Sequence, residues 1–170
     1  MPVRLLRDER GATAVEFGII ALPFFAIIAA ILETAFCFFA GQILDSAVTD
    51  AGRLIRTGQA QQQNMDLAAF KTQVCNRLYA FFSCSGLSLD VKTSTSFGAA
   101  DLSTPKDKDG NFDPSKFAYQ NTHGSEIVVV RAYYLYPLIF TGFGLNMADQ
   151  SGNKRLMSGI AVFRNEPFPW

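Results

Sequence analysis

The sequence has few of the side chains on which most metal and catalytic sites depend. It contains one histidine, His123, and three cysteines among its 170 residues. A structural zinc site needs about four Cys or His ligands at short, regular spacings, and the sequence has no such cluster. Its serines lie in no nucleophile-elbow or phosphate-loop pattern, and its acids are scattered. We therefore expect no metal ion, no cofactor and no enzymatic activity.

The chain also lacks an excess of charge of either sign. Fifteen Lys and Arg residues balance fifteen Asp and Glu residues. A general nucleic-acid binder carries a strongly basic surface, so the composition argues against that class. The sequence has no internal repeat, and beyond an apolar N-terminal segment it leaves room for one domain of about 115 residues.

Charge is almost absent from a long stretch near the N-terminus. Between Phe17 and Ile43 the only charged side chain is Glu33. About 20 apolar helical residues cross the hydrocarbon core of a bilayer, so the sequence predicts a transmembrane helix over about 17–43. A buried core helix is the alternative, but it rarely carries large apolar residues on every face. Pro23 is tolerated in membrane helices, and we expect a kink or local loosening near it.

Basic residues flank only one end of this stretch. Arg4, Arg7 and Arg10 precede it, and no Lys or Arg follows until Arg53. By the positive-inside rule, the N-terminus lies in the cytoplasm and the rest of the chain lies across the membrane. A secretory signal peptide is another alternative, but the apolar run is longer than an ordinary signal and no small-x-small cleavage site follows it.

The residues at the start of the apolar stretch form a motif. Gly11, Ala12 and three further small or apolar residues precede Glu16 and Phe17. This pattern resembles the processing site of type IV pilins. The resemblance implies that a prepilin peptidase cuts between Gly11 and Ala12, so that residues 1–11 are a leader peptide.

The same resemblance gives Glu16 and Phe17 a role in subunit register and assembly. Glu16 would be the fifth residue of the mature chain and would pair with the new α-amino group of a neighbouring subunit. A carboxylate in hydrocarbon is costly unless it is paired, and a buried pair of this kind fixes register. The alternative is an interfacial glutamate that reaches to water.

A second motif lies at the C-terminus, over residues 161–168. Arg164, Asn165, Glu166 and Pro167 within it resemble the C-terminal signature of TadE-like proteins, the minor pilins or pseudopilins of the tight-adherence (Flp, type IVc) pilus. The N-terminal motif is similar to the same family.

The family resemblance implies a structural pilus assembly protein that supports pilus biogenesis and surface adhesion. Its partners would be prepilin peptidase, other Tad pilins and the pilus assembly machinery. It would span the bacterial inner membrane once, with a periplasmic domain, and could be incorporated in an extracellular pilus. The alternative is an uncleaved single-pass protein whose periplasmic domain binds a ligand or an envelope partner.

The apolar periodicity predicts two helices. Beyond the membrane run, apolar residues recur every three or four positions as far as Ile55, so one long helix is expected over 12–57. Gly58 fits the position after its C-terminus. A second helix is expected over 66–82, where apolar residues again recur at helical spacing.

Three strands are expected in the remainder of the domain, which spans 58–170. They are predicted over 87–97, 126–136 and 155–164. The second is continuously apolar from Ile127 to Val130, which is typical of a central strand. The predicted fold class is α+β: a long N-terminal transmembrane helix that continues into a small domain with a second helix and a three-stranded antiparallel sheet. The pilin resemblance implies the same fold.

Cys75 and Cys84 are expected to form a disulfide, because paired cysteines in extracytoplasmic domains are usually oxidised. In a straight helix their nine-residue separation would place them about 13 Å apart along the axis. A disulfide needs Cα atoms within about 7 Å. The bond therefore requires the chain to turn back before Cys84. The third cysteine, Cys37, is expected to be a small buried apolar residue.

Two loops leave alternatives open. Residues 107–113 place oxygen-bearing side chains at alternate positions, as in the first half of a calcium loop. The glycine is misplaced, however, and no bidentate Glu follows, so we expect a solvated turn and leave calcium binding open. Residues 137–147 are apolar but broken by proline and glycine, and they pack on the core, on the membrane surface or on a partner.

Overall fold

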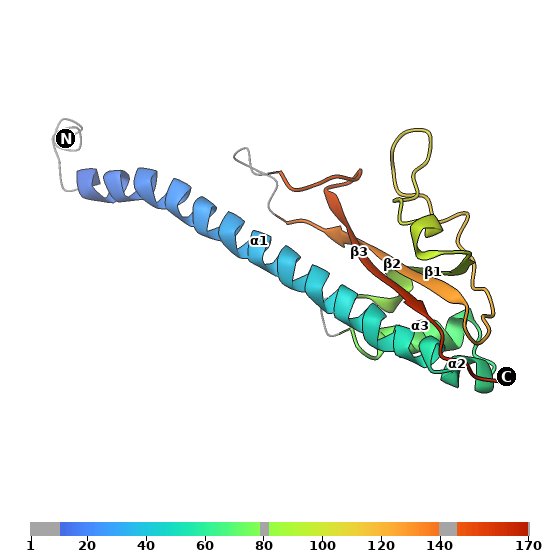
Figure 1. Cartoon of the computed structure of the whole chain (residues 1–170). Helices are drawn as coiled ribbons and strands as arrows, with labels where there is room; N and C mark the ends of the chain where they lie inside the picture. Colours follow the sequence, from blue (N-terminus) through green and yellow to red (C-terminus); the bar gives the residue numbers. More distant parts are fainter. Residues whose placement is uncertain (1–10, 79–81, 140–145, 170) are drawn as a thin grey trace, which may run out of the picture.

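The computed structural model describes residues 11–78, 82–139 and 146–169 (Figure 1). The elements are α1 (Ala12–Arg56), α2 (Gln59–Gln62), α3 (Leu67–Cys75), the 3-10 turns η3 (Cys84–Gly86) and η4 (Phe97–Ala99), and the strands β1 (Leu87–Ser94), β2 (Ile127–Pro137) and β3 (Lys154–Arg164). The α+β prediction is confirmed. Apart from Gly11, the predicted leader lies outside the described residues.

The three strands form one antiparallel sheet in the order β1-β2-β3. β2 is the central strand, as its apolar run predicts. Its residues from Ile127 to Tyr134 are buried, so both faces of the strand are covered. In the register, Val130 of β2 lies between Val91 of β1 and Ala161 of β3.

One face of the sheet packs against helices α1 and α3. Small and aliphatic residues of α1 lie on the same side of the helix, and Ala40, Leu44, Val48 and Ala51 are completely buried. They share a core with alternate residues of β2 and with Phe70 and Val74 of α3. The residues that share one face of α1 and the alternate residues of β2 therefore pack together in one apolar layer.

The opposite face of the sheet is covered by the long connection between β1 and β2 (Figure 1). The rings of Phe112 and Phe117 lie 5.2 Å and 5.6 Å from the ring of Tyr133, measured between centroids. The segment 118–120 also lies along the edge of β1, where Val91 exchanges two backbone hydrogen bonds with it. The connection between two of the predicted strands thus forms a packed layer.

The end of α1 agrees with the prediction. The helix stops at Arg56, and Gly58 has a φ of +77°. This left-handed conformation is the one that favours glycine after a helix C-terminus. The following residues form the short helix α2, which the sequence analysis did not predict. α1 is continuous through Pro23.

The second helix is shorter than predicted. Asp66 caps α3 by accepting a hydrogen bond from the N–H of Ala69 at 2.8 Å, as expected from its position. The prediction that the helix continues to residue 82 is wrong, because α3 ends at Cys75 and a turn follows. Phe82 then packs edge-on against Tyr134, with 4.9 Å between ring centroids, in a place that a continuous helix would not reach.

β1 also ends before its predicted limit. It stops at Ser94, and the Ser96 hydroxyl accepts a hydrogen bond from the N–H of Ala99 at 3.1 Å. This side-chain cap begins η4 and turns the chain away from the sheet. Phe97, predicted as the last strand residue, is exposed in that turn.

Candidate functional site

The N-terminal half of α1 extends beyond the domain (Figure 1). Gly11 is the residue before the helix, and α1 begins at Ala12. None of the residues from Ala12 to Ala29 is buried. The large apolar side chains exposed here are Val15, Phe17, Ile19, Ile20, Leu22, Phe24, Phe25, Ile27 and Ile28. Such a surface requires an apolar environment, either lipid or neighbouring helices.

α1 is long and apolar enough to cross a membrane. The prediction of a long apolar helix is therefore confirmed at the level of length and composition. A core helix of a soluble protein would be mostly buried, but only 6% of the most apolar stretch of α1 is buried. The face that does pack on the domain begins at Ala30.

The predicted processing and assembly residues lie together at the start of α1. Glu16 and Phe17 are both exposed. Glu16 lies four residues after Ala12, so the two side chains share a helix face about 6 Å apart along the axis. A Cβ added at Gly11 meets no atom within 4 Å, so the peptide bond after Gly11 is sterically open on that side.

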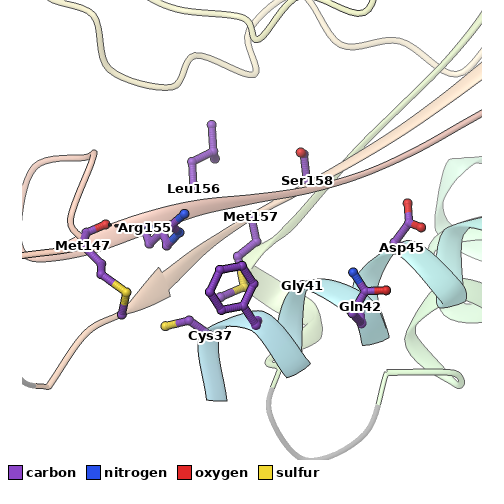
Figure 2. Close-up of a pocket in the computed structure, with 10 residues that line it drawn as sticks. Cys37, Gly41, Gln42, Asp45, Met147, Arg155, Leu156, Met157 and Ser158 are labelled. Atoms are coloured by element: carbon purple, nitrogen blue, oxygen red, sulfur yellow. Dashed lines mark hydrogen bonds between the residues drawn. The ribbon is translucent and has the colours of Figure 1, made fainter. Parts of the chain in front are cut away.

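A groove lies between α1 and β3, just C-terminal to the exposed half of the helix (Figure 2). Its volume is about 280 Å³. Cys37 and Phe38 line it from α1, and Met147 and Arg155 line it from the other side. Arg155 donates a hydrogen bond to the backbone oxygen of Met147 at 3.3 Å, which fixes the guanidinium at the rim. Cys37 itself is buried, as predicted.

The C-terminal motif lies at the other end of α1, roughly 60 Å along the helix from Glu16. The N–H of Glu166 donates to the oxygen of Arg56 at 2.9 Å, and the N–H of Asn165 donates to Glu126 at 2.8 Å. These bonds attach the C-terminal segment to the end of α1 and to the start of β2.

Within the motif, one side chain is buried and three are exposed. The Asn165 amide is buried and donates to the Thr122 hydroxyl at 3.1 Å and to the His123 oxygen at 2.8 Å. Arg164, Glu166 and Pro167 are exposed. The structure therefore gives Asn165 a structural part in joining three segments.

The disulfide is present between Cys75 and Cys84, whose Cα atoms lie 5.8 Å apart. The distance condition is met because α3 ends at Cys75 and the chain turns back before η3. The N–H of Ser83 donates to the Tyr134 hydroxyl at 3.2 Å, which ties the returning chain to the sheet.

A buried ion pair in the domain was missed by the sequence analysis. Asp90 of β1 and Arg131 of β2 are 1% and 4% exposed. The Arg131 guanidinium donates to one Asp90 oxygen through Nη2 at 2.6 Å and through Nε at 3.1 Å. The only signals in the sequence are a carboxylate in an alternating strand and an arginine within an otherwise apolar run.

The ion pair holds the covering loop on the sheet. Arg131 Nη1 donates to the backbone oxygens of Asp101 at 3.0 Å and Ser103 at 3.1 Å. Asp90 accepts from the N–H of Ala118 at 2.8 Å. Hydrogen bonds from the side chain and N–H of Ser103 lower the pKa of Asp101, and Arg131 adds to this. Burial raises the pKa of Tyr133, which packs beside the pair.

A larger hollow, of about 700 Å³, lies at the end of the domain far from the N-terminus, between the start of α3 and the covering loop. Its lining combines polar side chains, among them Asp66 and His123, with apolar and aromatic ones such as Met65, Leu67 and Tyr119. Asp66 is already engaged in capping α3, and burial raises the pKa of Tyr119.

Across the described residues, the structure gathers no group of three His, Cys, Asp or Glu side chains that could hold a metal ion. The loop 107–113 closes on itself. The Asp107 carboxylate accepts hydrogen bonds from the N–H groups of Asp109 and Asn111, at 2.9 Å and 2.8 Å. Gly110 in this turn has a φ of +85°. The Asp107 carboxylate, one of the groups considered as a calcium ligand, thus accepts hydrogen bonds within the turn.

The comparison with known families bears on the exposed helix. Residues 11–53 match the family of TadE-like proteins. The match confirms the predicted resemblance over this part of the chain. It covers α1 from Gly11 to Arg53 and includes Ala12, Glu16 and Phe17, whereas the C-terminal motif lies beyond it. No curated protein and no solved structure matches the chain.

Proposed function

We propose that the chain is a minor pilin, or pseudopilin, of a tight-adherence pilus that is processed by prepilin peptidase and supports pilus assembly and surface adhesion. The observation that carries this proposal is the apolar α1 helix, which begins at Ala12 and is exposed on every side over its first turns. The TadE-like match begins one residue earlier, at Gly11. A structural subunit needs such a helix twice, first as a membrane anchor and then as a packing surface for other pilins.

The cleavage site in this proposal is the Gly11–Ala12 bond. Gly11 stands at the junction between the charged leader and the helix, and its surroundings are open. Removal of residues 1–11 leaves Ala12 as the first residue of the mature chain. Its α-amino group is a positive charge at the helix N-terminus, where the helix dipole gives no compensation. A carboxylate from a neighbouring subunit would compensate this positive charge.

Glu16 is the carboxylate proposed for that pairing. It lies one turn above Ala12 on an exposed part of the helix. Two parallel subunits offset by one turn would bring the amino group of one chain to Glu16 of the other. The low dielectric of a helix bundle strengthens this attraction, and the requirement to pair a buried charge sets the axial register. Phe17 would pack beside the pair.

The proposed topology places the leader in the cytoplasm and the domain in the periplasm. Arg4, Arg7 and Arg10 precede the helix, and the next basic residue is Arg53. This asymmetry supports an N-in orientation. The disulfide supports the same side for the domain, because the periplasm is oxidising.

The processing step can be tested with Gly11→Leu and a matched Gly11→Ala control, each expressed in the native host. We expect Gly11→Ala to be trimmed and Gly11→Leu to keep its leader, because bulk before the scissile bond excludes the chain from the peptidase. A Cβ at this position meets no atom within 4 Å, and both variants carry one, so their difference reports on the added bulk of Leu. Intact-mass measurement distinguishes the two forms.

Normal trimming of Gly11→Leu would show that the site is wrong. An untrimmed wild-type chain would instead favour the other candidate, a plain single-pass protein whose outer domain binds a ligand or an envelope partner.

A further inference from the structure

The β2–β3 hairpin has a stem, which consists of residues 137–139 and, on the opposite strand, residues 154–155. The stem contacts α1 within the apolar run. β2 ends at Pro137, and the N–H of Ile139 donates to the Glu33 carboxylate at 2.5 Å. Leu32 and Phe36 of α1 face the same place, and together with the hairpin they enclose a mostly apolar hollow of about 300 Å³. The domain therefore reaches down beside the part of the helix that resembles a membrane span.

The apolar side chains at this contact are open to the surroundings. Ile139 is 96% exposed, Leu32 is 52% exposed and Phe36 is 50% exposed. Their surface is continuous with the exposed apolar surface of α1 below Ala30. The environment that covers the lower helix therefore also reaches Ile139, and exposed apolar patches of this kind mark an interaction surface.

The position of the contact along α1 agrees with the thickness of a bilayer. Glu33 lies roughly 21 residues after Ala12, which corresponds to about 32 Å of helix. The hydrocarbon core of a membrane is about 30 Å thick. With Ala12 at the inner boundary, the Glu33 carboxylate lies at the outer boundary, where a charged group is least costly.

Two basic residues of the hairpin lie in its stem, across from the end of β2. Lys154 and Arg155 begin β3 and pair with Pro137 and Tyr136 in the register. Lys154 is exposed, and Arg155 lines the groove between α1 and β3 (Figure 2). The nearby Asp149 carboxylate is engaged by the N–H of Leu156 at 2.7 Å. Lys and Arg near a membrane boundary extend their charges toward headgroup phosphates while their stems stay against apolar surface.

We propose that the stem of the β2–β3 hairpin rests on the outer surface of a phospholipid bilayer. Ile139, Leu32 and Phe36 contact the ends of the acyl chains nearest the headgroups, and Lys154 reaches the phosphates. The lipid-covered part of α1 is then 12–33, and the domain lies on the membrane instead of standing off from it. This inference rests on the proposed anchoring through α1.

The test uses tryptophan as a depth probe in the full chain. Trp170→Phe removes the one natural tryptophan, and single probes are then placed by Ile139→Trp, Phe25→Trp and Phe97→Trp. The protein is reconstituted in vesicles of phosphatidylcholine and phosphatidylglycerol whose acyl chains carry bromine either near the headgroup or near the methyl end. Phe25 lies on the bare helix, and Phe97 is exposed on η4, in the connection that covers the opposite face of the sheet.

We expect the Ile139→Trp probe to be quenched more by shallow bromine than by deep bromine, the Phe25→Trp probe to be quenched strongly by deep bromine, and the Phe97→Trp probe to stay unquenched. If Ile139→Trp behaves like Phe97→Trp while Phe25→Trp is quenched, the hairpin does not rest on lipid and the inference is overturned, although the anchoring stands. If Phe25→Trp is also unquenched, the anchoring itself fails and the inference falls with it.

Discussion

Glycine at position 159 sets the distance between α1 and the sheet. A Cβ at Gly159 would lie 3.0 Å from both the Leu44 oxygen and the Asp45 Cα. These are backbone atoms of α1, so the helix itself would have to move to make room. A single absent methyl group thus permits the close packing of the small residues of α1 on β3.

We predict that Gly159→Ala lowers the free energy of unfolding by about 1–3 kcal/mol, which is the usual cost of overpacking. The matched control is Gly41→Ala on α1, where an added Cβ meets no atom within 4 Å. It should be neutral or stabilising by up to about 1 kcal/mol, because Ala is a better helix former than Gly. Urea unfolding of the full chain in detergent micelles measures both. Equal effects of the two substitutions would contradict this account of the helix–sheet distance.

The Asp90–Arg131 pair is the second place where single residues decide the fold. Both side chains are buried and hydrogen-bonded. Removing Asp90 leaves the buried Arg131 charge with only the exposed Asp101 carboxylate as an ionic partner, at 3.4 Å. We predict that Asp90→Leu lowers the free energy of unfolding by about 3–5 kcal/mol.

The double variant Asp90→Leu/Arg131→Met should be clearly more stable than the sum of the two single effects predicts, because it removes both charges together. The double-mutant cycle is measured by urea unfolding under the same conditions. Additive effects would mean that the two charges do not depend on each other for their burial.

At the scale of elements, the sequence predicts those parts that follow a local pattern. α1 shows helical periodicity from the membrane run to Ile55, and its end at Gly58 follows from one glycine. β2 is central because it is apolar on both faces. β3 was predicted to within one residue of its start. The burial of α1 and of β2 follows the apolar pattern of their own sequences.

Other features depended on contacts between distant residues. The end of α3 at Cys75 was missed because Asn76, Arg77 and Leu78 are compatible with a helix. What stops the helix there is a disulfide to Cys84 and the packing of Phe82 on Tyr134, on a strand some fifty residues later. Such constraints carry no local signature.

The layer over the outer face of the sheet was missed for the same reason. Its anchors are Phe112, Phe117 and the Asp90–Arg131 pair, which are scattered over the β1–β2 connection and over those two strands. The assembly residues predicted at the start of α1 rest on a local motif, in which Glu16 and Phe17 are adjacent in sequence. The contact of Ile139 with Glu33 joins residues too far apart in sequence for any motif.

The disulfide is the element-scale feature most open to experiment. Alkylation without reduction, followed by peptide mapping, should label Cys37 after unfolding and find Cys75 and Cys84 linked. Cys75→Ser/Cys84→Ser should lose about 2–3 kcal/mol of unfolding free energy, because the closed loop is short. Cys37→Ala serves as the control that keeps the bond. Alkylated Cys75 and Cys84 in the unreduced wild type would show that the bond does not form in the cell.

On the scale of the whole molecule, the two halves of α1 differ in their surroundings. Its first half is bare and apolar, and its second half is the main support of the domain. The C-terminal segment is fastened to the last residue of α1 through Glu166 and to the start of β2 through Asn165. The domain is therefore attached to α1 both along the second half of the helix and at its C-terminal end.

The measurement that tests the central claim most directly is the N-terminal sequence of the protein purified from membranes of its native host. The account predicts a chain that begins Ala-Thr-Ala-Val-Glu, with Ala12 first and Glu16 fifth. A chain that still begins at Met1 or Pro2 would contradict it. Such a chain would be a single-pass membrane protein that is not processed as a pilin.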